Sequence, residues 1–398
     1  MVHNRDILRG VHELREPLGR PGIPMIENRR HFMLLASAAV LAAPRSRART
    51  ATPALRDPLI VNALGGLDDP NHPDPGFAVI TPRILADAHA SGEAAVNVTI
   101  GYVSGSDKDP FEFTVADVAH WDRLIREHSG DLLKVLTADD IARAKAERRI
   151  GVILGFQNAL MMGNDAQRVD VFADLGVRVV QLTYNPANPL GGGSMAPETL
   201  GLTPFGREVI ERLNARRVMV DLSHSGRQTC LDAARFSRQP ISINHTGCRA
   251  LVNLPRNKTD EELRLVADRG GFVGIYFMPF LNPTGHARAA DVVAHIEHAV
   301  KVCGEDHVGI GTDGGTTSID DLQAYAEVLR KEHEDRVSKG VAAPGEGVDT
   351  HPFVDDLRGP KQFDMLAHLL AGRGYSETRI AKVLGENFIR YARRIWDA

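Results

Sequence analysis

The stretch from residue 218 to residue 245, VMVDLSHSGRQTCLDAARFSRQPISINH, decides the fold. It begins with a short apolar run at 218–222, continues through a segment of helical periodicity at 227–236, and ends in a second apolar run at 241–244. Two short apolar runs separated by an amphipathic segment are typical of a βαβ unit, in which the two strands lie parallel.

The same alternation recurs over most of the chain and predicts a closed barrel. The run at 132–136 is interrupted by Lys134, so we expect it to be a loop or a peripheral strand, and eight strands remain. Repeated right-handed βα units close most economically into a (β/α)8 barrel of the TIM type. An open doubly wound sheet is the alternative, but no G-x-G-x-x-G follows the first run to support it. The short apolar runs are 59–64, 94–100, 132–136, 150–156, 177–183, 218–222, 241–244, 272–276 and 308–311.

The N-terminal segment is predicted to be a leader over residues 1–48, followed by a single domain over 49–398. Arg29 and Arg30 precede an apolar run at 33–43, which is the arrangement of a twin-arginine export signal. About eleven apolar residues are too few to span a bilayer, which takes roughly 20. We therefore expect a cleaved leader, no remaining transmembrane segment, and export of the folded protein to the periplasm. A leader that is simply a buried helix is the alternative.

The C-terminal tail reads as three helices in series, at 361–372, 376–384 and 386–396. We expect this helical appendage to cover the flank of the barrel or to support a homodimer contact. A charged helical segment at 319–339 follows the last strand and is long enough to act as a lid or as a partner surface.

Composition narrows the function classes. The 398 residues carry a net charge of −4, and a mildly acidic protein is a poor nucleic-acid binder. The three cysteines, Cys230, Cys248 and Cys303, are scattered, so we predict buried thiols and no disulfide framework.

Polar side chains stand where the predicted strands end. His245 directly follows an apolar run, and His224 and Asp313 each follow a run after one intervening residue. The chemistry of this kind of barrel sits at the carboxyl ends of its strands, so the three side chains should share one pocket. Imidazole nitrogens suit Zn²⁺, and the carboxylate can either bind the metal or take a proton from its water. The pair His72 and Asp74 also has a metal-binding spacing, but it lies in a proline-rich loop and we favour a solvated surface there.

These residues also carry a family resemblance. The segments MVDLSH (219–224), INH (243–245) followed by PRN (255–257), VGIGTD (308–313) and GENFIR (385–390) agree in order and spacing with the membrane (renal) dipeptidase family of zinc metallopeptidases. The chain resembles that family from about residue 59 to residue 396.

The resemblance implies a barrel that holds two zinc ions joined by a bridging glutamate and that hydrolyses dipeptides. It further implies that His224 and His245 bind the second zinc and that Asp313 shuttles the proton. Arg256 and Asn257 are implied to bind the substrate, and a guanidinium fork does suit a terminal carboxylate.

Three departures from the family pattern change the expected site. The His-x-Asp pair that holds the first zinc falls on Leu64 and Gly66, the bridging glutamate falls on Gln157, and a substrate-polarising histidine falls on Tyr184. Two zinc ions would lie among two neutral imidazoles, an amide and only one carboxylate, so most of their positive charge would not be balanced. We therefore expect one zinc ion or none, with Gln157 as a weak further ligand and Tyr184 as a hydrogen-bond donor to a developing oxyanion.

The sequence thus predicts a metal-dependent hydrolase of dipeptides or similar small peptide substrates with a reduced one-metal site. Two alternatives stay open. One is a catalytically inactive barrel that binds a small molecule or peptide, and the other is a metal-independent hydrolase that uses Asp313 and His245 as an acid/base pair.

Overall fold

The computed structural model describes residues 57–72, 78–105 and 108–397. The expected leader and Asp74 lie outside the described residues. Within these ranges, no helix is both long enough and apolar enough to cross a bilayer.

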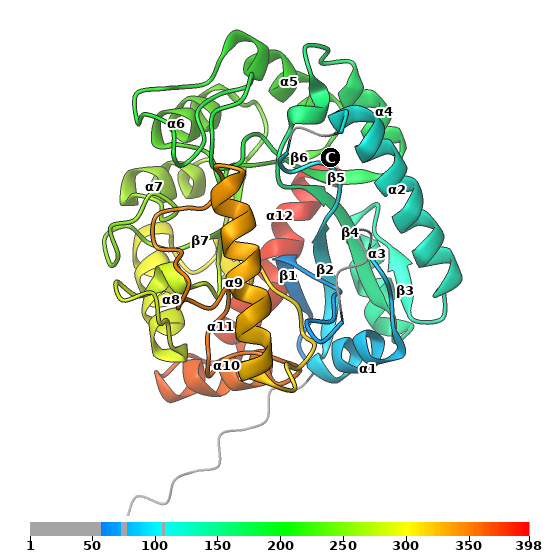
Figure 1. The fold of residues 1–398 in the computed structure, drawn as a ribbon, viewed down its shortest axis with the longest axis vertical. Coiled ribbons are helices and arrows are strands. Elements are labelled where there is room, and N and C mark those ends of the chain that lie inside the picture. The colour runs from blue at the N-terminus through cyan, green and yellow to red at the C-terminus, as the bar shows by residue number, and fades with distance from the viewer. Residues whose placement is uncertain (1–56, 73–77, 106–107, 398) are drawn as a thin grey trace, which may run out of the picture. The chain divides into compact units, whose positions relative to one another are not determined.

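In the described part of the chain, eight parallel strands follow one another around a barrel, as predicted (Figure 1). The barrel closes between its first and last strands, where Gly66 forms a parallel bridge with Gly315 and the amide of Asp313 donates to the carbonyl of Leu64 at 3.0 Å. The strands, in spatial order, are β1 (Ile60–Gly65), β2 (Glu93–Thr99), β4 (Ile150–Phe156), β5 (Val177–Gln181), β6 (Met219–Asp221), β7 (Ser242–Thr246), β8 (Phe272–Ile275) and β9 (Val308–Ile310).

The ninth run forms the peripheral strand β3 (Leu132–Lys134), as expected. β3 pairs with the first half of β4, from Ile150 to Val152, whereas β5 pairs with the second half. The ammonium group of Lys134 donates to Asp122 and to the carbonyl of Leu175, both at 2.7 Å. This run therefore extends the sheet beside β4 and takes no place in the ring.

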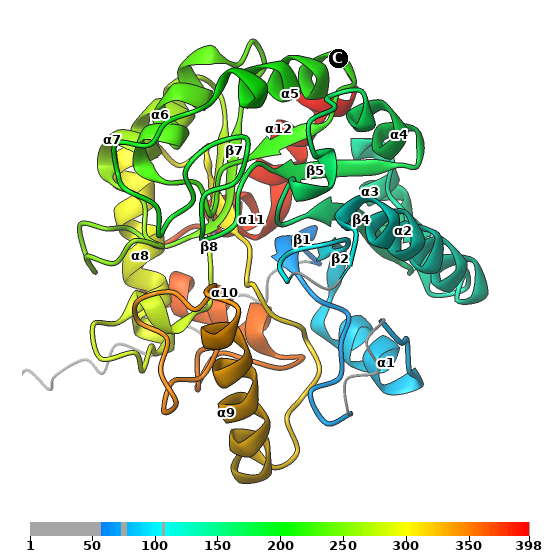
Figure 2. The same cartoon turned by 45° about the horizontal axis from the view of Figure 1, so that its top comes forward.

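Helices surround the strands (Figure 2). Threonine capping boxes begin two of them, at Thr137 and Thr259. In each, the threonine hydroxyl accepts from the backbone amide three residues later, and the acidic side chain of that later residue accepts from the backbone amide of the threonine. The helices are α1 (Pro82–Ser91), α2 (Pro110–Glu127), α3 (Ala138–Ala146), α4 (Arg168–Asp174), α5 (Pro204–Ala215), α6 (Arg227–Phe236), α7 (Asp260–Asp268), α8 (Ala289–Cys303) and α9 (Leu322–Ser338).

The C-terminal helices do more than cover a flank. α12 packs Phe388 and Trp396 into one cluster with Phe272, the first residue of β8. The amide of Asn387 donates to the carbonyl of Val308, the first residue of β9, at 2.8 Å. Because these contacts are with strand starts, α12 closes the amino end of the barrel. α10 packs against α8 and α1, as expected for a helix that covers the flank. The tail comprises α10 (Gln362–Gly372), α11 (Glu377–Ala381), a π-helical turn (Lys382–Glu386) and α12 (Asn387–Trp396).

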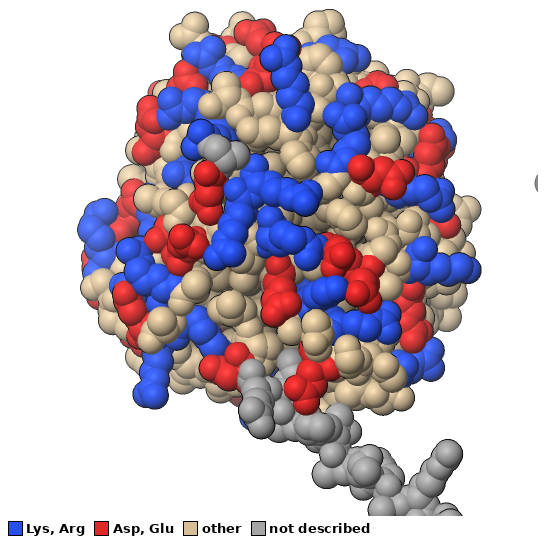
Figure 3. Space-filling view, turned by 180° about the vertical axis from the view of Figure 1, so that it is seen from behind, with Lys and Arg blue, Asp and Glu red and all other residues tan. Residues whose placement is uncertain are grey.

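The surface opposite α9 carries lysine and arginine side chains intermixed with aspartate and glutamate (Figure 3). Cys230, Cys248 and Cys303 are buried free thiols, as predicted.

Glu93, at the start of β2, is a buried carboxyl whose two oxygens both lack a hydrogen-bond partner. Burial raises its pKa from 4.5 to about 8. A group whose pKa is higher in the folded than in the unfolded state makes its full contribution to stability only below the pKa of the unfolded state. This contribution is lost as the pH rises through the pKa of the folded state.

We expect Glu93→Gln to remove that pH dependence. Between pH 4.5 and pH 8, the unfolding free energy of the wild type should fall relative to that of the variant by up to about 4 kcal/mol. Urea unfolding of both proteins across this range measures the difference. Parallel stability profiles for the two proteins would show that Glu93 is ionised in the fold.

Candidate active site

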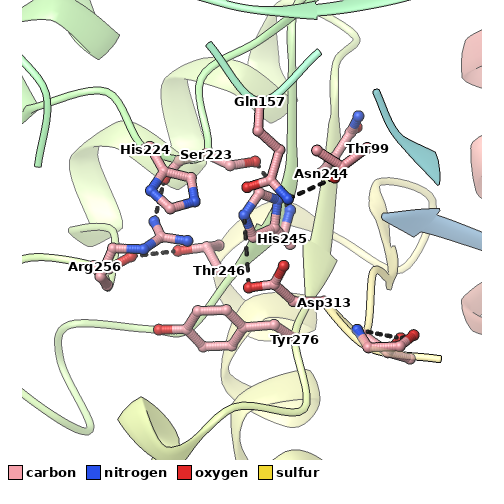
Figure 4. A network of polar contacts seen from close by, with 12 residues as sticks. Thr99, Gln157, Ser223, His224, Asn244, His245, Thr246, Arg256, Tyr276 and Asp313 are labelled. Carbon is pink, nitrogen blue, oxygen red and sulfur yellow. Dashed lines mark hydrogen bonds and ion pairs between the residues drawn. The ribbon is translucent and has the colours of Figure 1, made fainter. Parts of the chain in front are cut away.

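The carboxylate of Asp221 fixes the chain where β6 and β7 end. Its Oδ1 accepts from the Ser223 amide and the Asn244 amide, both at 3.0 Å, and from the Ser223 hydroxyl at 2.5 Å. The same hydroxyl accepts from the amide of His245 at 3.0 Å. These bonds bring His224 and His245 side by side, with ring centroids 5.0 Å apart (Figure 4).

His224 is held in one tautomer by Asn185. The Asn185 amide nitrogen donates to the carbonyl of Val341 at 2.7 Å, so its Oδ1 is left to accept. That oxygen receives Nδ1–H of His224 at 2.6 Å and the hydroxyl of Ser194 at 2.8 Å. The buried Nε2 of His224 therefore carries a lone pair and has no partner. A fixed tautomer with a free Nε2 is the state that a metal-binding histidine needs.

His245 is buried with neither ring nitrogen hydrogen-bonded. Burial, and then the positive charge of Arg256, hold the pKa of both His224 and His245 well below the usual range. Both imidazoles are therefore neutral. A buried polar atom without a hydrogen-bond partner lowers the stability of the fold, so these nitrogens indicate a site that binds a ligand.

Asp313 faces this pair from the end of β9. Its Oδ2 lies 4.0 Å from Nε2 of His245, and burial raises its pKa to about 6. Its backbone has a φ of 61°, in the left-handed region that non-glycine residues seldom adopt. A carboxyl with a pKa near neutrality is suited to exchange protons with a substrate or a water.

Arg256 is buried beside the histidines, with 1% of its surface exposed. Its Nη1 donates to the carbonyl of Ser223 at 2.6 Å, whereas Nη2 is buried without a partner. A guanidinium that is anchored on one side and free on the other can receive a carboxylate.

Tyr184 stacks on the His224 ring with centroids 4.2 Å apart. Its hydroxyl accepts from Nη1 of Arg336 at 3.0 Å, and Arg336 is itself held by Glu346 through two bonds of 2.7 and 2.8 Å. Because the hydroxyl accepts this bond, its own proton is free to be donated. Arg336 was not among the predicted site residues, because nothing in the sequence distinguishes one charged residue of an exposed helix from its neighbours.

A cavity of about 240 Å³ joins these groups. The expected site residues that line it are His224, Asp313, Arg256, Tyr184 and Gln157. His245 is fully buried and does not line the cavity, but its Nε2 lies 4.0 Å from Oδ2 of Asp313, which does. Glu332, His333 and Arg336 of α9 line its outer side, so this helix forms part of the wall.

Asn257 is not brought into this cavity. Its amide nitrogen donates to the carbonyls of Val252 and Phe280 at 2.8 and 2.9 Å, and its Oδ1 accepts from the hydroxyl of Tyr276 at 2.5 Å. These bonds occupy the amide in holding loops together. The structure therefore does not give Asn257 the substrate contact that the family resemblance implied.

The donor set decides how many metal ions fit. Leu64 is a buried apolar residue and Gly66 has no side chain, so neither of these two positions offers a ligand. Gln157 is a neutral amide whose nitrogen donates to the Thr99 hydroxyl at 2.7 Å. Among the described residues, no three His, Cys, Asp or Glu side chains form a ready metal cluster. Two ions do not fit this site, whereas the free nitrogens of the two histidines fit one.

A family model described as "Membrane dipeptidase (Peptidase family M19)" matches residues 92–343. The chain belongs to this family. The matched range starts after β1. β1 is the strand whose end lacks the His-x-Asp pair that the resemblance implies for the first zinc. The resemblance inferred from the motifs is confirmed, and with it the assignment of the chain to a family of dipeptidase-like hydrolases.

Individual relatives and solved structures are similar to most of the chain. The chain is 28% identical over 302 residues to an uncharacterised protein in the pqqA 5′ region of Klebsiella pneumoniae, which covers 73% of this chain and 98% of that protein. The structure of an amidohydrolase from Pseudomonas aeruginosa matches with a TM-score of 0.72 and 31% identity, over 86% of this chain and 98% of the other. A metallopeptidase from Rhodobacter sphaeroides, solved with a phosphinate mimic of the dipeptide L-Ala-D-Ala, shares the fold with a TM-score of 0.66 and 21% identity, over 85% and 99% of the chains.

Proposed function

We propose that this member of the membrane dipeptidase family hydrolyses dipeptides or similar small amides at a site with a single metal ion. The observation that carries the proposal is the pair of buried neutral imidazoles, His224 and His245, with unpartnered nitrogens beside the carboxyl of Asp313. Relatives named as dipeptidases, one in Schizosaccharomyces pombe at 30% identity over 52% of this chain and 53% of that protein, support the substrate class.

His224 would hold the ion through Nε2, and His245 through one of its free nitrogens. A further donor is Asp313 or the oxygen of Gln157, because the Gln157 nitrogen is already bound to Thr99. When bound, a zinc ion lowers the pKa of a coordinated water and polarises a carbonyl.

Three side chains would supply the proton transfer, the stabilisation of negative charge and the binding of the substrate carboxylate. Asp313 takes the proton from the attacking water and returns it to the leaving amine. The Tyr184 hydroxyl, fixed by Arg336, donates to the oxygen that becomes negative. The free Nη2 of Arg256 binds the carboxylate of the substrate and sets its direction in the cavity.

A panel of dipeptides, assayed with zinc, manganese or cobalt supplied, tests the proposal. We expect hydrolysis that is lost on chelation and restored by one of these metals. Dipeptide binding without turnover under every condition would favour a catalytically inactive binding barrel. Full activity in the chelated, metal-free protein would instead favour a metal-independent hydrolase.

Arg256→Ala should raise KM by about 10- to 100-fold and leave kcat little changed, because a substrate carboxylate is held alike in the ground and transition states. Dipeptides and their C-terminal amides are compared in steady-state assays. The wild type should prefer the free carboxylate, and the variant should not.

Arg227→Ala removes a surface arginine paired with Glu261 and serves as the matched control. An Arg256→Ala variant that keeps the wild-type preference for the free carboxylate would contradict this role.

A further inference from the structure

A second cavity, of about 170 Å³, lies next to the first, and Asp313 and Pro352 line both. Its wall is part aromatic, with Phe277, Tyr325 and Phe353, and it reaches the end of β1. Asp313 therefore stands at the border between two compartments, of which only the first contains Arg256.

The carboxylate of Asp68 occupies the part of this second cavity beside β1. A Cβ atom on Gly66 would lie 2.2 Å from Oδ1 of Asp68, and one on Gly315 would lie 2.5 Å from the same oxygen. Both distances are shorter than any tolerated contact. The two glycines thus leave room for the carboxylate, and a side chain at either position would displace it.

Asp68 has no partner for its charge. Its side chain is exposed where it lines the cavity, and among the described residues none forms an ion pair with it. The cationic residue of the wall, Arg358, has other contacts: its Nε donates to the carbonyl of Asp355 at 3.2 Å, and its guanidinium lies over the Phe353 ring. An unpaired carboxylate in a concave, partly aromatic site is suited to a cationic group.

We propose that Asp68 binds the free α-ammonium group of the substrate, with the N-terminal residue of the dipeptide in the second cavity. This inference rests on the proposed function. Arg256 in the first cavity and Asp68 in the second would hold opposite ends of the substrate, so that the amide bond lies at Asp313 between them. The substrate class is then narrowed to dipeptides with an unblocked amino terminus, and the aromatic wall favours a large N-terminal side chain.

The test compares a dipeptide with its des-amino analogue, in which hydrogen replaces the α-amino group. The wild type should prefer the free amine by about 10- to 100-fold in kcat/KM, a difference typical of one charge-assisted bond. Asp68→Asn should bring the two substrates to near equality, chiefly by raising KM for the free amine.

Two further variants separate the role of the carboxylate from general damage. Gly66→Ala keeps every charge but moves the Asp68 carboxylate aside, so it should reproduce the loss of preference. Asp139→Asn removes an acid paired with Arg393 and should keep the preference of the wild type.

Three outcomes would overturn the assignment. An equal loss on both substrates in Asp68→Asn would make the residue structural. A fall in metal content in that variant, measured by elemental analysis, would make Asp68 a metal ligand. An unchanged preference would show that the ammonium group binds elsewhere.

If the wild type hydrolyses neither compound, the proposed function fails and calorimetry decides the inference separately. Tighter binding of the free-amine compound to the wild type, lost in Asp68→Asn, would still support it. Equal binding of both compounds would overturn it.

Discussion

Asp313→Asn is expected to lower kcat for dipeptide hydrolysis by about 10²- to 10⁴-fold with little change in KM, since it removes the proton acceptor and keeps the shape. Asparagine tolerates the left-handed backbone found at this position, which makes it the variant least disturbing to the fold. Steady-state kinetics at saturating metal measure the effect.

Thermal unfolding serves as the control for Asp313→Asn and should show a Tm close to that of the wild type. A variant that hydrolyses dipeptides as fast as the wild type would mean that the carboxylate only supports the end of β9.

His224→Ala and His245→Ala should each empty the metal site and abolish hydrolysis, because the loss of either imidazole leaves too few donors to hold an ion. Elemental analysis after dialysis, together with the dipeptide assay, measures both effects. Asn185→Ala offers a graded comparison, because it frees the His224 ring without removing it and should weaken metal binding by about 10- to 100-fold. Retention of the full metal content in either alanine variant would place the ion elsewhere.

Periodicity was sufficient to predict the barrel. Short apolar runs alternating with amphipathic segments determine parallel strands, and Lys134 marked the one run that stays outside the ring. The meeting of His224, His245 and Asp313 followed from the same reasoning, since residues that end successive strands must share one face of a barrel.

Other parts of the site could not be found in this way because they depend on contacts between distant segments. The apolar face of α12 indicates that the helix is buried, but not that it is buried against strand starts. Arg336 reaches Tyr184 from 152 positions away, through a helix whose sequence reads as a solvated surface. Asn257 shows the opposite case. The family resemblance implied a substrate contact for it, but its amide nitrogen is bound to the carbonyls of Val252 and Phe280.

The end of β1 departs from the family pattern, and the structure shows what occupies the space that the departure leaves. The absence of a side chain at Gly66 reads in the sequence as the loss of a ligand. In the structure, the same absence makes room for the carboxylate of Asp68, two positions later. The sequence alone gives no reason to connect the two residues, because Asp68 follows the strand in a loop whose path the periodicity does not determine.

The number of metal ions per active chain tests the central claim most directly. Metal-free protein is titrated with zinc, and dipeptide hydrolysis is followed against the metal content found by elemental analysis. We predict that activity rises to a plateau at one ion per chain. A plateau reached only at two tightly held ions per chain would contradict the account and would make His72 and Asp74 the first further ligands to test.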